Sequence, residues 1–105
     1  MNRILTFALA ATVALTAFAD GNKDNSTRNE RNFIVDGNKL YRQERYAEAE
    51  VAYRKALQEN ALNEVARFNL AASLLRQGSA SQENLKEASS ILSALAKDAE
   101  NLSIA

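Results

Sequence analysis

Apolar residues recur three or four positions apart through most of the chain after residue 30. This spacing places them on one face of an α-helix, so the pattern predicts helices and no strands. Short polar stretches that lack the spacing separate four such segments. The predicted helices span residues 30–43, 46–60, 64–77 and a fourth segment from Leu85 onward.

Local signals mark several ends of these helices. Thr27 and Glu30 have the spacing of a capping box, which favours a helix start at that point. Asn63 is suited to cap the third helix, and Gly78 is suited to end it as a C′ glycine. Residues 20–29 are polar and include a glycine, so we expect a flexible spacer before the first helix.

The N-terminal segment, residues 1–19, follows a different pattern. Arg3 precedes an apolar run from Ile4 to Ala19, which ends in Ala17-Phe18-Ala19. A short positive start, an apolar run and small residues at its end are typical of a secretory signal peptide, here cleaved after Ala19. The alternative is an uncleaved membrane anchor, but the run is shorter than the roughly 20 residues that span a bilayer. We therefore expect a periplasmic or secreted protein.

Composition supports an all-α chain of one domain. The 105 residues include no proline and three glycines, so helix breakers are scarce. Lys+Arg and Asp+Glu both number 13, so no net charge attracts nucleic acid or an anionic membrane. Contact with a membrane is expected only through partners or an uncleaved signal segment.

The residue types that most often carry catalysis or bind metal are missing. The sequence has no histidine and no cysteine, which removes the commonest general base, the commonest metal ligand and all thiolate sites. Glu48 and Glu50 lie two positions apart on a predicted helix, face different directions and are expected to be solvated. We expect no catalytic residue, metal or cofactor, and therefore a binding protein and not an enzyme.

The chain also resembles itself at a fixed offset. Leu40-Tyr41-Arg42-Gln43 recurs as Leu74-Leu75-Arg76-Gln77, at an offset of 34. The second helices match at an offset of 39, so five extra residues are expected in a loop at residues 78–84. Self-similarity of this kind indicates stacked helical hairpins. We predict one unit over residues 30–63 and a second over residues 64–102, with residues 103–105 as the start of a third that is cut short.

The first unit resembles the tetratricopeptide repeat (TPR) family. The positions that carry the resemblance are Phe33, Gly37, Leu40, Tyr46, Ala49, Tyr53 and Ala56. Small residues at some of these positions let two helices approach, and large ones fill the space beside them. Asp36, Glu59 and Ala61 depart from the usual pattern. The alternative is an ordinary helical bundle with a chance spacing.

A longer stretch, over about residues 31–78, is similar to the exported TPR component of bacterial aerotolerance (Bat) operons. The similar strings are residues 36–41 and 49–57, although much of both is general TPR consensus. This resemblance implies an adaptor that helps to assemble an envelope complex with membrane proteins carrying von Willebrand factor A-type domains.

In TPR proteins a groove lined by the first helix of each unit holds a peptide. The resemblance places in this groove Asn38, Tyr41, Arg42, Asn69, Ala72 and Arg76. The two asparagines match residues that contact a terminal carboxylate in chaperone-binding members, but Ile34 replaces the lysine that these members also use. In a weaker version of the same site, Arg42 and Arg76 would bind an acidic or backbone-rich segment of the partner. The alternative is a polar groove wall exposed to solvent.

The last predicted helix carries an apolar face, formed by Ile91, Leu92 and Leu95, that a following helix would normally cover. Repeat arrays generally need about three units to be stable. We therefore expect this open end to be covered by further chain, by a partner or by a second copy. Self-association as a structural module is the first alternative to the adaptor function, and an enzyme with an unrecognised site is the second and least favoured.

Overall fold

The computed structural model describes residues 23–78 and 81–104, and this part of the chain is entirely helical. Its helices are α2 (Lys23–Arg42), α3 (Tyr46–Glu59), α4 (Glu64–Arg76) and α5 (Gln82–Ile104). The predicted all-α class is thereby confirmed. The predicted signal peptide of residues 1–19 lies outside the described residues.

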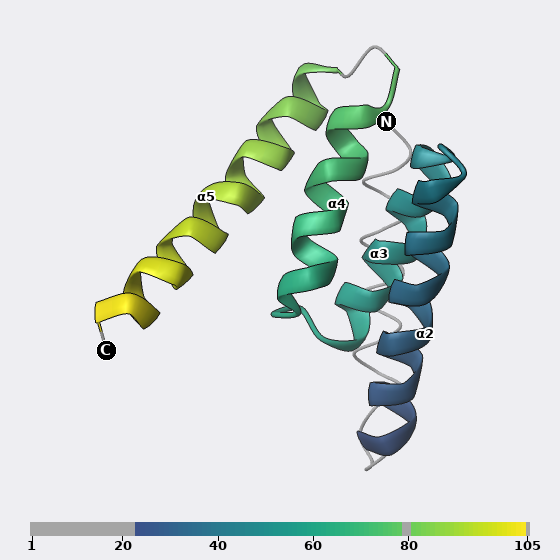
Figure 1. Cartoon of the computed structure of the whole chain (residues 1–105), viewed down its shortest axis with the longest axis horizontal. Helices are drawn as coiled ribbons and strands as arrows, with labels where there is room; N and C mark the ends of the chain where they lie inside the picture. Colours follow the sequence, from purple (N-terminus) through teal and green to yellow (C-terminus); the bar gives the residue numbers. More distant parts are fainter. Residues whose placement is uncertain (1–22, 79–80, 105) are drawn as a thin grey trace.

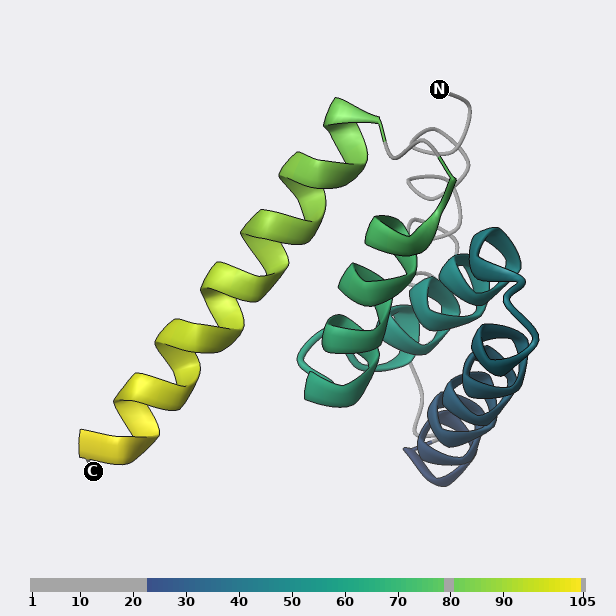
Figure 2. The ribbon, with the colours of Figure 1, turned by 45° about the horizontal axis from the view of Figure 1, so that its top comes forward.

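Consecutive helices pack as antiparallel neighbours (Figure 1). Helix α4 lies between α5 and the α2–α3 hairpin, as a second view also shows (Figure 2). Helix α2 also touches α4, whereas the backbone of α5 approaches only that of α4 among the described helices. The later part of α5 extends away from the other helices (Figures 1 and 2). The two hairpins are thus joined through α3 and α4.

Helix α2 is already present at Lys23, the first described residue, which is seven residues before the predicted start at Glu30. The expected spacer is therefore helical from residue 23, and Thr27 lies inside the helix and not at a capping position. Contacts with the end of the first hairpin explain the extension. Ser26 Oγ donates to Glu59 Oε1 at 3.0 Å. Glu30 Oε2 accepts from the side chain of Asn63 at 2.5 Å, so tertiary contacts hold a stretch of weak helix formers.

The two turns nearest the middle of the chain agree with the sequence. Helix α3 begins at Tyr46 after a turn in which Glu44 has a positive φ of 63°. Helix α4 begins after Asn63, whose side chain accepts from Ala66 N at 2.8 Å. The predicted N-cap is therefore confirmed, and it satisfies one of the free N–H groups of the first turn.

Both ends of α5 differ from the prediction. The helix begins at Gln82, inside the expected loop, because Ser81 Oγ accepts from Asn84 N at 3.1 Å and caps the first turn. Gly78 follows the end of α4 but does not take the left-handed conformation expected of a C′ glycine. At its other end α5 continues to Ile104, so residues 103 and 104 extend this helix.

The core joins α3, α4 and the first part of α5. Its buried apolar residues are Ala49, Tyr53, Leu70, Ala71, Leu74 and Ala88. Gly37 of α2 lies directly on the ring of Tyr53, because a Cβ atom added there would lie 2.5 Å from Tyr53 Cε1. The expected close approach of α2 and α3 is thus confirmed at this position.

Candidate protein-binding surface

The structure brings the predicted groove residues to one surface formed by α2 and α4. Asn69 Nδ2 of α4 donates to Asn38 Oδ1 of α2 at 3.1 Å. The guanidinium of Arg76 lies 6.0 Å from the ring centroid of Tyr41. Arg42 is exposed on α2, and Ala72 is half-buried on α4. We call this the α2–α4 surface.

Asn38 and Asn69 also form hydrogen bonds within the protein. The hydroxyl of Tyr53 donates to Asn38 Oδ1 at 2.6 Å. Tyr53 is only 1% exposed, and this burial raises the pKa of its hydroxyl to about 12. Asn38 therefore supplies the acceptor that a buried tyrosine needs. The bonds use the carbonyl oxygen of Asn38 and one amide hydrogen of Asn69, so N–H donors remain for a bound carboxylate.

One end of the surface is cationic and aromatic. The rings of Tyr41 and Tyr46 meet edge to face with centroids 5.0 Å apart. The guanidinium of Arg76 lies 5.0 Å from the Tyr46 centroid, and its Nη2 donates to Tyr46 Oη at 2.9 Å. Arg76 is exposed and stands at the C-terminal end of α4, where a positive charge is favoured. Its side chain is thus held in place while remaining accessible.

An apolar stripe runs along α4 beside this cluster. It consists of Val65, Phe68, Ala72 and Leu75, spaced by three, four and three residues. Phe68 is 56% exposed, and Val65 and Leu75 are exposed as well. The structure buries Leu70 and Leu74 on the other side of the same helix. The clue that was missed is that apolar residues surround most of this helix, more than one buried face requires.

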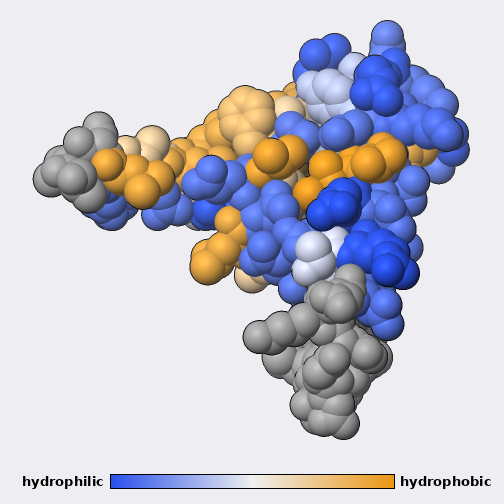
Figure 3. Space-filling view, turned by 60° about the horizontal axis from the view of Figure 1, so that its bottom comes forward, coloured by the Kyte–Doolittle hydropathy of each residue, from blue (hydrophilic) through white to orange (hydrophobic). Residues whose placement is uncertain are grey.

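The predicted open end is partly covered by α4. Ile91 and Leu92 pack against the core, and Leu95 is half-buried. The more exposed apolar residues of α5 are Leu85, at 48%, and Leu102, at 70%. Apolar side chains form a band along the projecting helix and continue onto the body of the molecule (Figure 3). A groove between α4 and α5 is lined by Leu75, Leu85, Ala88, Ser89, Leu92, Ser93 and Ala96.

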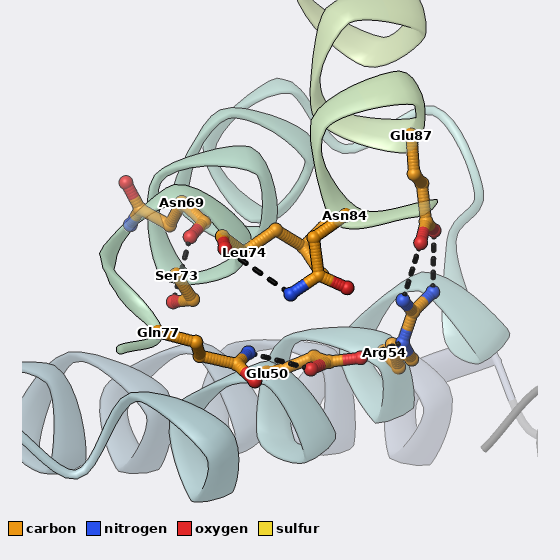
Figure 4. Close-up of polar contacts among 8 residues, drawn as sticks. All are labelled: Glu50, Arg54, Asn69, Ser73, Leu74, Gln77, Asn84 and Glu87. Carbon is orange, nitrogen blue, oxygen red and sulfur yellow. Dashed lines mark hydrogen bonds and ion pairs between the residues drawn. The ribbon is translucent and has the colours of Figure 1, made fainter. Parts of the chain in front are cut away.

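A buried charged network joins α3 to the second hairpin (Figure 4). Glu50 is 1% exposed and accepts from Arg54 Nε at 2.8 Å and from Gln77 Nε2 at 2.7 Å. Arg54 also donates from both terminal nitrogens to Glu87 at 2.8 Å. The expectation that Glu50 is solvated was therefore wrong. Glu48 is exposed and pairs with Arg45.

This network holds α3 against the second hairpin. Burial works to lower the pKa of Arg54, but its hydrogen bonds to Glu87 and Glu50 outweigh burial and raise the pKa. Arg54 thus stays charged and links α3 to the start of α5, while Gln77 links Glu50 to the end of α4. Periodicity could not reveal this, because nothing in the spacing distinguishes a buried glutamate from an exposed one.

No helix in the described part of the chain is both long and apolar enough to cross a membrane. Comparison of the chain with protein-family models, with curated proteins and with solved structures finds no match. The chemistry of the α2–α4 surface is therefore what indicates a function.

Proposed function

We propose that this protein is an exported adaptor of TPR type that binds a segment of another protein on its α2–α4 surface. The observation that carries the proposal is the stripe on α4, where Phe68 is 56% exposed although the opposite side of the same helix forms the core. Contiguous exposed apolar residues beside polar groups commonly mark sites of protein interaction. The four antiparallel helices and the contact of Gly37 with Tyr53 support the TPR assignment.

The chemistry of the surface indicates what it binds. Apolar side chains of the partner would pack against Val65 and Phe68, and acidic or carbonyl groups would meet Arg42 and Arg76. Arg76 is already oriented by Tyr46, so a charge-assisted hydrogen bond to a carboxylate costs less ordering of its side chain. The partner segment is therefore apolar with an acidic group near one end.

The partner that we propose is a membrane protein with a von Willebrand factor A-type domain, as the resemblance to Bat components implies. In this proposal the signal peptide is removed after Ala19, and the adaptor works outside the cytoplasm in assembling an envelope complex. The intact mass of the protein from its host is then that of a chain starting at Asp20. A mass that includes Met1 would contradict export by cleavage.

The test is affinity capture from the host after mild crosslinking, with three forms of the protein. Phe68→Ser removes the centre of the stripe, and Val51→Ser is its control, because Val51 is 52% exposed but lies on α3. We expect the wild type and the control to recover proteins with such domains and Phe68→Ser to lose them. Equal recovery with all three forms, or recovery of no such protein, would refute the proposal.

A second experiment tests the asparagines. Asn38→Ala leaves the buried hydroxyl of Tyr53 without its acceptor, so this substitution also lowers stability. Asn69→Ala keeps that acceptor and removes only the second amide. If the folded Asn69→Ala variant and the Asn38→Ala, Asn69→Ala double variant both keep full partner affinity, these asparagines do not contact a carboxylate of the partner.

A further inference from the structure

Four cations and one valine form a row along the outer face of α2. Arg31 and Lys39 lie four residues before and after Val35, and Arg28 and Arg42 lie seven residues before and after it. At 3.6 residues per turn, these offsets correspond to about 40° and about 20° around the helix, so the five side chains share one face. All five are exposed, Val35 at 57%. We call this row the basic stripe, and its length is about 21 Å at 1.5 Å per residue.

The basic stripe faces away from the rest of the molecule. Val35 is two residues from Gly37, or about 200° around the helix, and Gly37 is the residue that packs on Tyr53 of α3. Helix α2 also lies at one edge of the helical array (Figures 1 and 2). The acidic residues within the length of the stripe are Glu30 and Asp36, which lie about 140° and about 100° around the helix from Val35. The charges on this face are therefore all positive.

Folding alone does not account for the basic stripe. Every ion pair in the described part of the chain uses a cation outside α2, so the four cations have no acidic partner there. The helix dipole favours Lys39 and Arg42, which lie in the last turn of α2, but it does not favour Arg28 and Arg31. Neighbouring like charges weaken a helix. An anionic surface outside the chain would relieve this repulsion.

We infer that the basic stripe binds the surface of an anionic phospholipid membrane, with α2 lying along it. An interface with another protein generally has an apolar core, whereas the stripe has one apolar side chain among four charges. Attraction to anionic lipids requires only clustered cations, and each cation near the surface strengthens binding by about fivefold. Three of the four cations are arginines, whose planar guanidinium groups bind phosphate oxygens in pairs.

The zero net charge of the whole chain does not oppose this attraction. Salt screens exposed charges over about 8 Å at physiological ionic strength, so a membrane responds to the charges that face it and not to the total. The inference replaces the expectation from the sequence that the chain meets a membrane only through partners or a signal segment. Arg42 belongs to both the basic stripe and the α2–α4 surface, so membrane binding would place that surface beside the lipid headgroups. The inference goes beyond the adaptor function and does not depend on it.

The first test is cosedimentation with phospholipid vesicles, on the protein as its host produces it. One set of vesicles contains equal parts of phosphatidylglycerol and phosphatidylcholine, and the other contains phosphatidylcholine alone. We expect binding to the anionic vesicles that weakens by about tenfold or more between about 50 mM and about 300 mM salt, and no binding to the neutral vesicles. Failure to bind the anionic vesicles, or equal binding to both sets, would overturn the inference.

The second test locates the contact on α2. The Arg31→Glu, Lys39→Glu double variant reverses two charges of the stripe, and Lys86→Glu, Lys97→Glu makes the same change in net charge at two exposed positions of α5. We expect the stripe variant to bind anionic vesicles at least tenfold more weakly than the α5 variant, with circular dichroism confirming that both are folded. The charge-preserving variant Arg31→Lys, Lys39→Arg should bind like the wild type.

Two outcomes would overturn the assignment of the stripe to a membrane. Equal loss of vesicle binding in the two reversal variants would mean that net charge decides binding. A stripe variant that keeps vesicle binding but loses partner capture would assign the stripe to a protein. Partner capture that fails in the wild type while vesicle binding persists would refute only the adaptor function.

Discussion

Gly37 is the position where a single added methyl group most directly tests the packing of the first hairpin. The substitution is Gly37→Ala, in the interior of α2. Helix propensity alone predicts that alanine stabilises the helix by about 1 kcal/mol. Tertiary packing predicts the opposite. The new Cβ atom would lie 2.5 Å from Tyr53 Cε1 and 2.8 Å from its Cδ1 and Cζ atoms.

The ring of Tyr53 has little freedom to move away. It is 1% exposed, and its hydroxyl donates to Asn38 on the same helix as Gly37. Overpacking of a core costs about 1–3 kcal/mol, and loss of a hydrogen bond from a buried hydroxyl costs a further ~1–3 kcal/mol. After subtracting the gain in propensity of about 1 kcal/mol, we expect the free energy of unfolding to fall by about 1–5 kcal/mol.

The assay is urea unfolding followed by far-ultraviolet circular dichroism. Gly78→Ala is the control, because a Cβ atom there meets nothing within 4 Å. Its free energy of unfolding should stay the same or rise by about 0.5 kcal/mol. A Gly37→Ala protein as stable as the wild type, or more stable, would refute the packing argument.

A double-mutant cycle locates the effect. Tyr53→Leu removes the ring, and the second unit already carries Ala71 and Leu92 at the corresponding positions. Gly37→Ala should therefore cost less in the Tyr53→Leu background than in the wild type, with a coupling of about 1–2 kcal/mol. Simple additivity would mean that the methyl group acts elsewhere.

Three further predictions concern pH, the charged network and the turn at Glu44 between α2 and α3. Because burial raises the pKa of Tyr53 to about 12, the folded state keeps a proton that the unfolded state loses near pH 10. Stability should therefore fall by about 2–3 kcal/mol as the pH rises from about 10 to about 12, and Tyr53→Phe should lose this component in pH-dependent urea unfolding. Glu50→Ala should lower the free energy of unfolding by about 3 kcal/mol, because it leaves Arg54 buried with one carboxylate fewer. Glu48→Ala removes only an exposed ion pair and should change the free energy of unfolding far less. Glu44 has a φ of 63°, a conformation that is strained for a residue with a side chain. Glu44→Gly should therefore raise the free energy of unfolding by about 1 kcal/mol and raise the melting temperature. An unchanged or lower melting temperature would contradict this strain.

The sequence was sufficient where local chemistry decides the structure. The bounds of α3 and α4 were predicted within a residue or two, and the cap at Asn63 was predicted correctly. Both follow from residues that are neighbours in the chain. The first turn of α2 was not predictable in this way. Polar residues 23–29 are weak helix formers, and they become helical where Ser26 and Glu30 reach the end of the first hairpin.

The candidate surface was likewise predictable from the sequence only in part. The resemblance to the TPR family placed Asn38 and Asn69, and Tyr41 and Arg76, in the same predicted groove, and the structure brings each pair together. Sequence could not show that Asn38 serves the buried hydroxyl of Tyr53. Nor could it separate the exposed Phe68 from the buried Leu70, because both belong to one apolar helix.

The sequence by itself determined that the chain is helical, where two of its turns lie and which residues recur, since these follow from propensity, caps and spacing. Tertiary structure alone decided which apolar face of α4 is buried, that Glu50 is buried between Arg54 and Gln77, and how far α5 extends beyond α4. The physical reason is that burial depends on what packs against a residue. That neighbour is often distant in the chain, as Glu87 of α5 is from Arg54 of α3.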